Sequence, residues 1–358
     1  MLDLKSVYLY FLSIKKITIK TVRGLFFSTS FYNNRLLTEI PSRFFFYPNP
    51  YLLSPFLNHR EHLLKISKFE ANYFWSGSRN KSDIKNLHSF LWLNLIDRKN
   101  DKESMRKIIN DWIKNYGNYK REIWDENILS KRVIAWISNA DLFLDKKDDK
   151  FHKFFTTYLI KQVNFLKRNL NIVSYETTKI SCLASIILSG LVFKEYYLNY
   201  NLGIRELKKI IDNFFDKNGF PKNRNPESLT HFLQYFIIIK EWIQNAQEEV
   251  PEYLNEIIDK NLICLNSLKN ESKNLPLFNG STEKNLDSFF IYLSKLNYVY
   301  NKKSKFVGQI QIIKTKKNTL YFDSGEPPIY EYSKDYQSGP LSFEYFHEGD
   351  KIITNCGY

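Results

Sequence analysis

Apolar residues recur at steps of three and four positions along most of the chain. In residues 103–117, for example, Met105, Ile108, Ile109 and Trp112 follow this spacing, which places them on one face of a helix. The same pattern predicts helices over residues 84–96, 103–117, 126–144, 151–170, 177–193, 204–215, 229–243, 250–268 and 285–300. The connections between them are short and polar, which favours antiparallel neighbours. We therefore predict helical hairpins in series, as in an α-solenoid or a closed α/α toroid.

The period changes from helical to alternating near Phe306. Residues 307–325 and 339–357 contain short β-branched and aromatic runs separated by Gly, Asp and Pro. This pattern predicts antiparallel β structure from about residue 305 onward. Three or four strands do not close a sandwich, and an open sheet edge exposes unpaired backbone groups. We therefore expect this chain to be a piece of a longer protein, with its β domain truncated at Tyr358.

The N-terminal segment is apolar and basic over residues 1–27. Its longest uncharged run, residues 6–14, is too short to span a bilayer, and no signal-peptide pattern is clear. We predict an amphipathic helix that packs on its own domain without stable membrane insertion; peripheral membrane contact is the alternative. Residues 28–68 carry four prolines and predict an extended, aromatic-rich segment. The expected domains are 1–70, a helical domain 71–304, and the first strands of a β domain, 305–358.

Composition adds little to this picture. The net charge of +14 suggests an acidic partner such as nucleic acid, an anionic membrane or a polyanionic glycan. However, 40 of the 52 cations are Lys, and Lys, Asn, Ile, Phe and Tyr are all abundant, as expected from an AT-rich genome. Cys182, Cys264 and Cys356 have neither zinc-site nor disulfide spacing, and the first two are predicted to be small core residues. We expect no metal and no cofactor. Both the cytoplasm and the bacterial envelope are compatible with this composition.

Five stretches resemble the heparinase II/III family, the polysaccharide lyases and their relatives. They are residues 88–96 (HSFLWLNLI), 130–139 (SKRVIAWISN), 216–228 (DKNGFPKNRNPES), 275–281 (LPLFNGS) and 338–357 (SGPLSFEYFHEGDKIITNCG). Their order and spacing carry the resemblance, which covers the chain from about Tyr73. It implies a mainly α fold, an incomplete α/α toroid followed by the start of an antiparallel β-sandwich. It also implies an acidic polysaccharide as partner.

The resemblance further implies cleavage of uronic-acid polysaccharides by β-elimination. This chemistry needs a cationic or polar group that neutralises the uronate carboxylate, a base that removes the C5 proton, and an acid that protonates the leaving O4. Arg, Asn and His suit the first role, and Tyr and His suit the other two. The core mechanism needs no metal.

The polar bend within residues 218–236 provides the first candidates. Arg224 and Asn225 are expected to bind substrate, and His231, at the start of a helix, to be catalytic. Structural alternatives remain open for all three. Arg224 would pair with a carboxylate, Asn225 would cap the next helix, and His231 would pack in the core.

Two further pairs are candidates. Tyr175 and Glu176 occupy the family's catalytic neighbourhood, so we expect Tyr175 to be catalytic and Glu176 to bind substrate. Alternatively, they simply begin a helix, whose positive end favours Glu176. Arg132 and Trp136 lie one turn apart on a helix face, which suits a charged sugar stacked on an aromatic ring. The alternative is that they belong to the core.

Departures from the family pattern keep a second function open. Tyr336 stands where relatives often carry His shortly before the LSFE stretch. The alternative is therefore a non-catalytic protein that binds acidic glycans or assists an envelope polysaccharide. A helical-repeat binder of nucleic acid or protein has only the charge in its favour, and no nucleic-acid motif is present, so we expect no nucleic-acid partner. The sequence carries no signal for an oligomeric state.

Overall fold

The computed structural model describes residues 4–57, 75, 81–96, 102–145, 148–298, 301–336, 339 and 341–355. The α-helices are α1 (Leu4–Ser28), α2 (Ser30–Arg35), α4 (Lys81–Ser89), α5 (Lys102–Tyr116), α6 (Glu126–Ser138), α7 (Asp149–Asn169), α8 (Glu176–Val192), α9 (Tyr197–Phe214), α10 (Pro226–Asn245), α11 (Glu252–Leu268) and α12 (Asp287–Lys295). Short 3₁₀ helices are η1 (Pro50–Phe56), η2 (Leu91–Leu95), η3 (Ala140–Leu142), η4 (Leu170–Ile172), η5 (Lys194–Tyr196) and η6 (Tyr330–Tyr332). The strands are β1 (Phe306–Val307), β2 (Ile310–Lys314), β3 (Asn318–Asp323), β4 (Phe343–His347) and β5 (Asp350–Ile353).

The predicted succession of helices and the change to β structure near residue 306 are both confirmed. The chain divides into two compact units. Unit 1 comprises residues 1–47 and 62–171, and unit 2 comprises residues 48–61 and 172–358. The domain limits expected from the sequence, at residues 70 and 304, stay predictions.

In unit 1, α4, α6 and α7 pack around an aromatic core. The rings of Trp112 and Trp136 lie 5.1 Å apart in an edge-to-face arrangement, and Phe90 lies 5.3 Å from Trp136. Such pairs add to the burial of apolar area. The heptad-like spacing of α5 is explained by this core, because Ile108, Ile109 and Trp112 are all buried in it.

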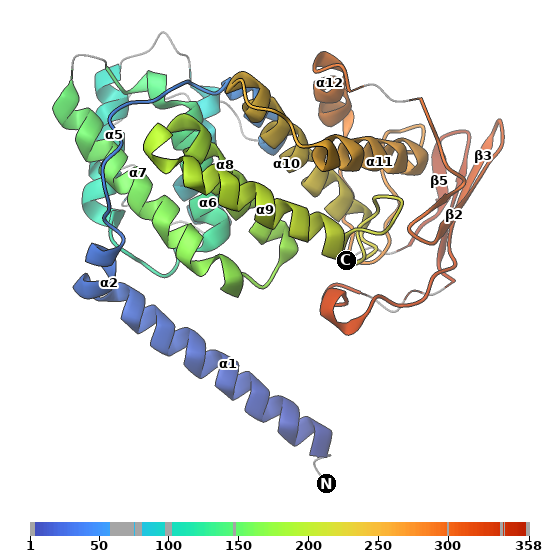
Figure 1. The fold of residues 1–358 in the computed structure, drawn as a ribbon. Coiled ribbons are helices and arrows are strands. Elements are labelled where there is room, and N and C mark those ends of the chain that lie inside the picture. The colour runs from blue at the N-terminus through green and yellow to red at the C-terminus, as the bar shows by residue number, and fades with distance from the viewer. Residues whose placement is uncertain are drawn as a thin grey trace. The chain divides into compact units, whose positions relative to one another are not determined.

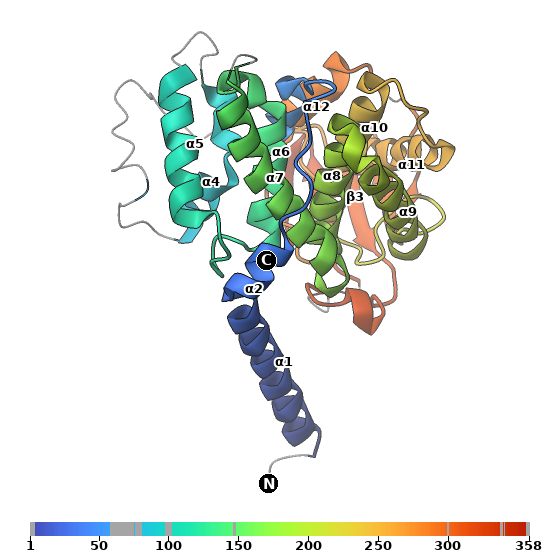
Figure 2. The ribbon, with the colours of Figure 1, turned by 60° about the vertical axis from the view of Figure 1, so that its left-hand side comes forward.

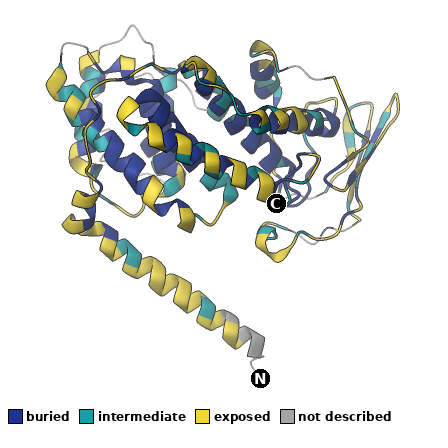
Figure 3. Cartoon of the chain, viewed as in Figure 1, coloured by how far each residue is buried: buried dark blue, intermediate teal, exposed yellow. Residues whose placement is uncertain are grey.

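Helix α1 behaves differently from the other long helices. Large apolar side chains along it, including Phe11, Ile17, Val22 and Leu25, are exposed, and Figure 3 shows the helix mostly in the exposed colour. Phe27, near its end, is buried against Tyr32 and Phe165. The expectation that this helix packs along its own domain is therefore wrong for most of its length. None of the described helices is both long and apolar enough to cross a membrane.

In unit 2, helices α8, α9, α10 and α11 are neighbours (Figures 1 and 2). The approach of α9 to α8 depends on Gly190, because a Cβ there would lie 2.3 Å from the backbone nitrogen of Tyr200. The core predictions for Cys182 and Cys264 are confirmed, since both are buried free cysteines. This packing places α8 and α10 next to each other.

The five strands form one antiparallel meander in the order β1-β2-β3-β4-β5. Side chains of β3 alternate, so that Thr319, Tyr321 and Asp323 are buried on the same face. In the register of the sheet, Asp323 pairs with Ile310 of β2. A carboxylate is therefore buried at the last position of β3.

Candidate functional site

The bend before α10 is built by its own side chains. Asp216 Oδ1 accepts hydrogen bonds from the backbone N–H groups of Asn218 and Phe220, at 2.9 and 2.8 Å. Gly219 has φ +82°, and a Cβ there would lie 2.5 Å from the Lys260 side chain, so the turn requires glycine. Asn261, which is buried on α11, donates to the Gly219 carbonyl at 2.6 Å. The polar stretch is thus an ordered turn docked on α11.

Arg224, at the end of this bend, connects it to the sheet. Its Nε donates to the Gly308 carbonyl at 3.3 Å and its Nη1 to the Glu326 carbonyl at 2.7 Å. Its Nη2 forms an ion pair with Asp323. The carboxylate-pairing alternative is therefore present in the structure, and a substrate contact by Arg224 stays a prediction.

Asn225 is the N-cap of α10. Its Oδ1 accepts from the backbone N–H of Glu227 at 2.7 Å and of Ser228 at 3.3 Å, and from the Ser281 hydroxyl at 2.9 Å. The capping alternative is thus confirmed. None of the hydrogen bonds among the described residues uses Asn225 Nδ2, so this amide keeps donors that a ligand could take.

Glu227, in the first turn of α10, binds the segment that follows Ser281. Its carboxylate accepts from the Thr282 backbone and hydroxyl at 3.1 and 2.8 Å and pairs with Lys284. Burial opposes ionisation, but Lys284 and Thr282 outweigh it, so the pKa of Glu227 is lowered. A carboxylate that is ionised at neutral pH therefore lies beside the cap.

The first turn of α8 and the second turn of α10 bring three of the predicted residues together. His231 Nε2 lies 2.9 Å from the carbonyl oxygen of Thr177, one residue after Glu176. Because a carbonyl only accepts, Nε2 carries the proton, and in the neutral ring Nδ1 then holds the lone pair. Tyr175, at the N-cap of α8, has 51% of its surface exposed. Tyr175, Glu176 and His231 thus lie at two adjoining helix starts.

Lys334 completes this group. Its Nζ lies 4.5 Å from the centroid of the Tyr175 ring and donates to the Ser174 carbonyl. The sequence pattern does not predict a role for Lys334, because this residue lies in an irregular segment after η6 that has no periodic pattern. Tyr332 holds this segment, since its hydroxyl donates to the Asn213 carbonyl at 3.1 Å.

Two residues further on, Tyr336 reaches the Arg224–Asp323 pair. Burial and the nearby Asp323 raise the pKa of Tyr336, with Arg224 opposing. Its hydroxyl is buried and has no hydrogen bond to any described residue. The segment from Lys334 to Tyr336 therefore runs from the start of α8 to the base of the bend. We call Tyr175, Glu176, Arg224, Asn225, His231, Lys334 and Tyr336 the α8–α10 cluster.

Arg132 and Trp136 belong to unit 1 and are described separately. Arg132 is wholly buried, with Nε 2.6 Å from Gln162 Oε1, Nη1 2.9 Å from the His88 carbonyl, and the guanidinium 4.3 Å from the Trp112 ring centroid. Burial lowers the pKa of Arg132. Trp136 is equally buried. These contacts favour the packing alternative for both residues, and a substrate contact by either one stays a prediction.

The described residues contain no group of three or more His, Cys, Asp or Glu side chains arranged to hold a metal ion. The chemistry that the α8–α10 cluster offers is that of an imidazole, two phenols, an amide, a carboxylate, an ammonium and a guanidinium. These groups suit proton transfer and the binding of an anion.

Two comparisons with known proteins give matches, one to a family model and one to solved structures. Residues 303–358 match the family described as heparinase II/III-like, C-terminal. A solved structure of heparinase III is 16% identical with a TM-score of 0.62, covering 79% of this chain and 52% of that one. Heparan sulfate lyase HepC from Pedobacter heparinus is 14% identical with a TM-score of 0.59, covering 80% and 51%. The Heparinase III-BT4657 gene product is 13% identical with a TM-score of 0.60, covering 81% and 54%.

This chain spans about half the length of the solved structures that it resembles. Comparison with curated protein sequences gives no match. At these identities the structural likeness establishes the fold: an α/α toroid arrangement of helices followed by antiparallel β structure.

Proposed function

We propose that this chain, whose residues 303–358 match the heparinase II/III-like C-terminal family, is a polysaccharide lyase-like protein that acts on uronic-acid-containing polysaccharides by β-elimination. The observation that carries the proposal is that His231 Nε2 lies 2.9 Å from the carbonyl of Thr177, two residues after Tyr175, while Lys334 lies over the Tyr175 ring. An acid–base pair and a cation for the substrate carboxylate thus come from three separate segments of unit 2.

Each group has a role in the proposed reaction. Lys334 offers positive charge beside Tyr175, where a bound uronate carboxylate would need it. The exposed Tyr175 phenol and the His231 imidazole are the two groups that exchange protons with C5 and O4. Asn225 Nδ2 donates to the carboxylate from the N-terminus of α10, an end of a helix that favours anions.

The first experiment measures unsaturated products by ultraviolet absorbance on a panel of uronic-acid polysaccharides. We expect Tyr175→Phe and His231→Gln each to lower the rate by about 10²–10⁴-fold. The matched control is Tyr197→Phe, because Tyr197 is also an exposed tyrosine at a helix start in unit 2. Turnover that survives both cluster substitutions, or equal turnover of a neutral polysaccharide, would refute the proposal.

Binding without cleavage is the second candidate. It is favoured by Tyr336, which stands where the family resemblance leads one to expect histidine and whose hydroxyl is buried beside Arg224 and Asp323. A protein of this kind would retard acidic glycans in a mobility assay, would form no unsaturated product, and would lose retardation in Lys334→Gln.

A further inference from the structure

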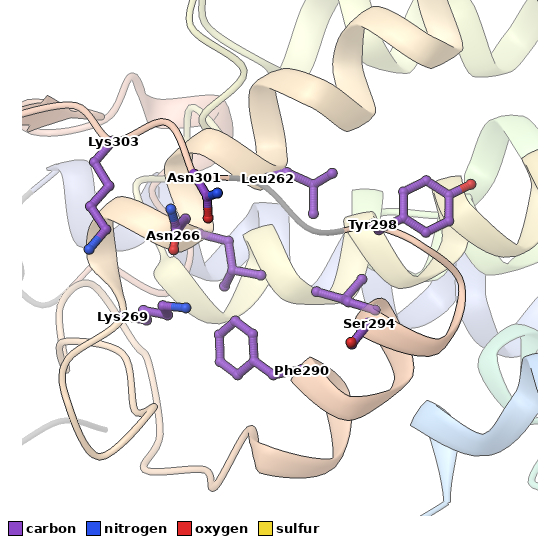
Figure 4. A pocket seen from close by; sticks show the side chains of 10 residues that line it. Leu262, Asn266, Lys269, Phe290, Ser294, Tyr298, Asn301 and Lys303 are labelled. Atoms are coloured by element: carbon purple, nitrogen blue, oxygen red, sulfur yellow. The ribbon is translucent and has the colours of Figure 1, made fainter.

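A polar cavity lies in unit 2 between α11, α12 and residues 301–303. Its volume is about 400 Å³, within the range of about 300–1,000 Å³ that small-molecule sites usually have. Figure 4 shows its lining side chains. None of them belongs to the α8–α10 cluster.

One side of the cavity is apolar and aromatic. Leu262, Leu265 and Leu293 contribute aliphatic surface, and Phe290 and Tyr298 contribute rings. The Tyr298 hydroxyl donates to Glu241 Oε1 at 2.8 Å, which fixes the ring. An aromatic ring such as that of Phe290 suits the apolar side of a sugar ring.

The other side carries amides and ammonium groups. Asn266, Lys269 and Lys303 lie together at one end of the cavity, and Tyr298 lies at the other (Figure 4). Lys269 Nζ is 4.8 Å from the centroid of the Phe290 ring, so the cation and the aromatic face are adjacent. None of the described lining residues is acidic. Among the described residues, neither Lys269 nor Lys303 forms an ion pair.

The positive charge at this end extends behind the cavity. Lys314 Nζ donates to the carbonyls of Ser267 and Lys269 at 3.1 and 2.9 Å, which places a third cation at the C-terminal end of α11. Burial, and then Lys303 and Lys273, lower the pKa of Lys269. Burial, Lys303 and Lys269 lower the pKa of Lys314 to about 8. The lysines thus repel one another, and a bound anion would relieve this repulsion.

We propose that this cavity binds one acidic sugar residue, with the ring against Phe290 and the carboxylate toward Lys269 and Lys303. The choice of an acidic sugar rests on the proposed function. The cavity would be a second binding site for the same polymer, separate from the α8–α10 cluster. A neutral sugar would leave the lysines uncompensated, and a small inorganic anion would leave the aromatic face unused.

The experiment compares methyl β-glucuronoside with methyl β-glucoside by saturation-transfer NMR on the whole chain. We expect the glucuronoside to bind at least about tenfold more tightly. Lys269→Gln and Phe290→Ala should each weaken it about tenfold, and Lys269→Gln tests the site even if Phe290→Ala fails to fold. The matched control is Lys260→Gln, which removes the same charge from α11, the helix that Lys269 caps, at a position outside the cavity.

Three outcomes would overturn the inference: equal binding of the two sugars, binding unaffected by Lys269→Gln, or displacement of the glucuronoside by equimolar inorganic sulfate. The two proposals fail separately. If no uronan is cleaved or retarded but Lys269→Gln still weakens glucuronoside binding, the cavity assignment stands and the proposed function falls. If uronans are cleaved and Lys269→Gln changes nothing, only the cavity assignment falls.

Discussion

Arg224 and Asp323 form an ion pair in which only 6% and 1% of the two side chains are exposed, although 99 positions separate them in the chain. Asp323 Oδ1 also accepts from the Gly325 backbone at 3.1 Å, and Asn279 Nδ2 lies 3.5 Å from Oδ2. The pair joins the bend before α10 to the end of β3. It therefore couples the position of the α8–α10 cluster to the integrity of the sheet.

The first prediction concerns this pair. Asp323→Asn leaves the Arg224 guanidinium buried without its counter-charge, so the free energy of unfolding should fall by about 3–5 kcal/mol. Urea denaturation measures the change. The control is Asp212→Asn, which removes the exposed pair with Lys208 and should change stability by about 0–1 kcal/mol. Equal effects of the two substitutions would mean that Arg224 is accommodated in another way.

The second prediction separates the two roles of Asn225. As a cap, Asn225→Asp should preserve stability, whereas Asn225→Ala should lower the free energy of unfolding by about 0.5–2 kcal/mol. If Asn225 contacts the substrate, the two variants should rank in the opposite order for glycan binding. A new carboxylate would repel a uronate, so Asn225→Asp should weaken glycan binding about fivefold to tenfold, and more than Asn225→Ala does. If both variants bind glycan like the unaltered protein, Asn225 only caps.

The order of helices and the start of the sheet could be predicted, because they depend on local periodicity. The N-cap at Asn225 could also be predicted, since Asn followed by Pro is a local helix-start signal. The partner of Arg224 could not be predicted, because Asp323 is brought next to Arg224 only by the fold of unit 2. The contact between Lys334 and Tyr175 could not be predicted either. The two residues are 159 positions apart in the chain, and the segment around Lys334 has no periodic pattern.

The burial of an apolar face is the other property that periodicity does not reveal. In α6 the periodic face lies in the core, so that Arg132 and Trp136 are wholly buried. In α1 a comparable apolar pattern lies exposed. The pattern identifies the apolar side of a helix, but whether another element covers it depends on tertiary contacts.

The third prediction concerns pH. Lys161 is 3% exposed, and burial lowers its pKa to about 8 from 10.5. The unfolded chain therefore binds this proton more tightly than the folded chain, so the Lys161 contribution should make the free energy of unfolding rise as pH increases from about 8 to 10.5. Below about pH 8 the penalty on the folded state is complete.

Lys161→Met should remove that rise and increase the free energy of unfolding at pH 7 by about 1–3 kcal/mol. Thermal unfolding at several pH values measures both effects. Lys153→Met, on the exposed side of the same helix, is the control and should change neither. A pH profile that is the same with and without Lys161 would show that the charge is well solvated in the folded protein.

The last prediction addresses Tyr336. Its hydroxyl is buried without a hydrogen bond to any described residue, whereas the hydroxyl of Tyr332 donates to the Asn213 carbonyl. An unsatisfied buried polar group costs the folded state a desolvation penalty of about 1–3 kcal/mol, and removing the group removes part of this cost. We therefore expect Tyr336→Phe to leave the free energy of unfolding unchanged or higher, and Tyr332→Phe to lower it by about 1 kcal/mol. Tyr336→Phe should also leave turnover or glycan binding unchanged, since the hydroxyl does not reach solvent. A large loss of activity in Tyr336→Phe with stability intact would instead make this phenol an acid or base of the reaction.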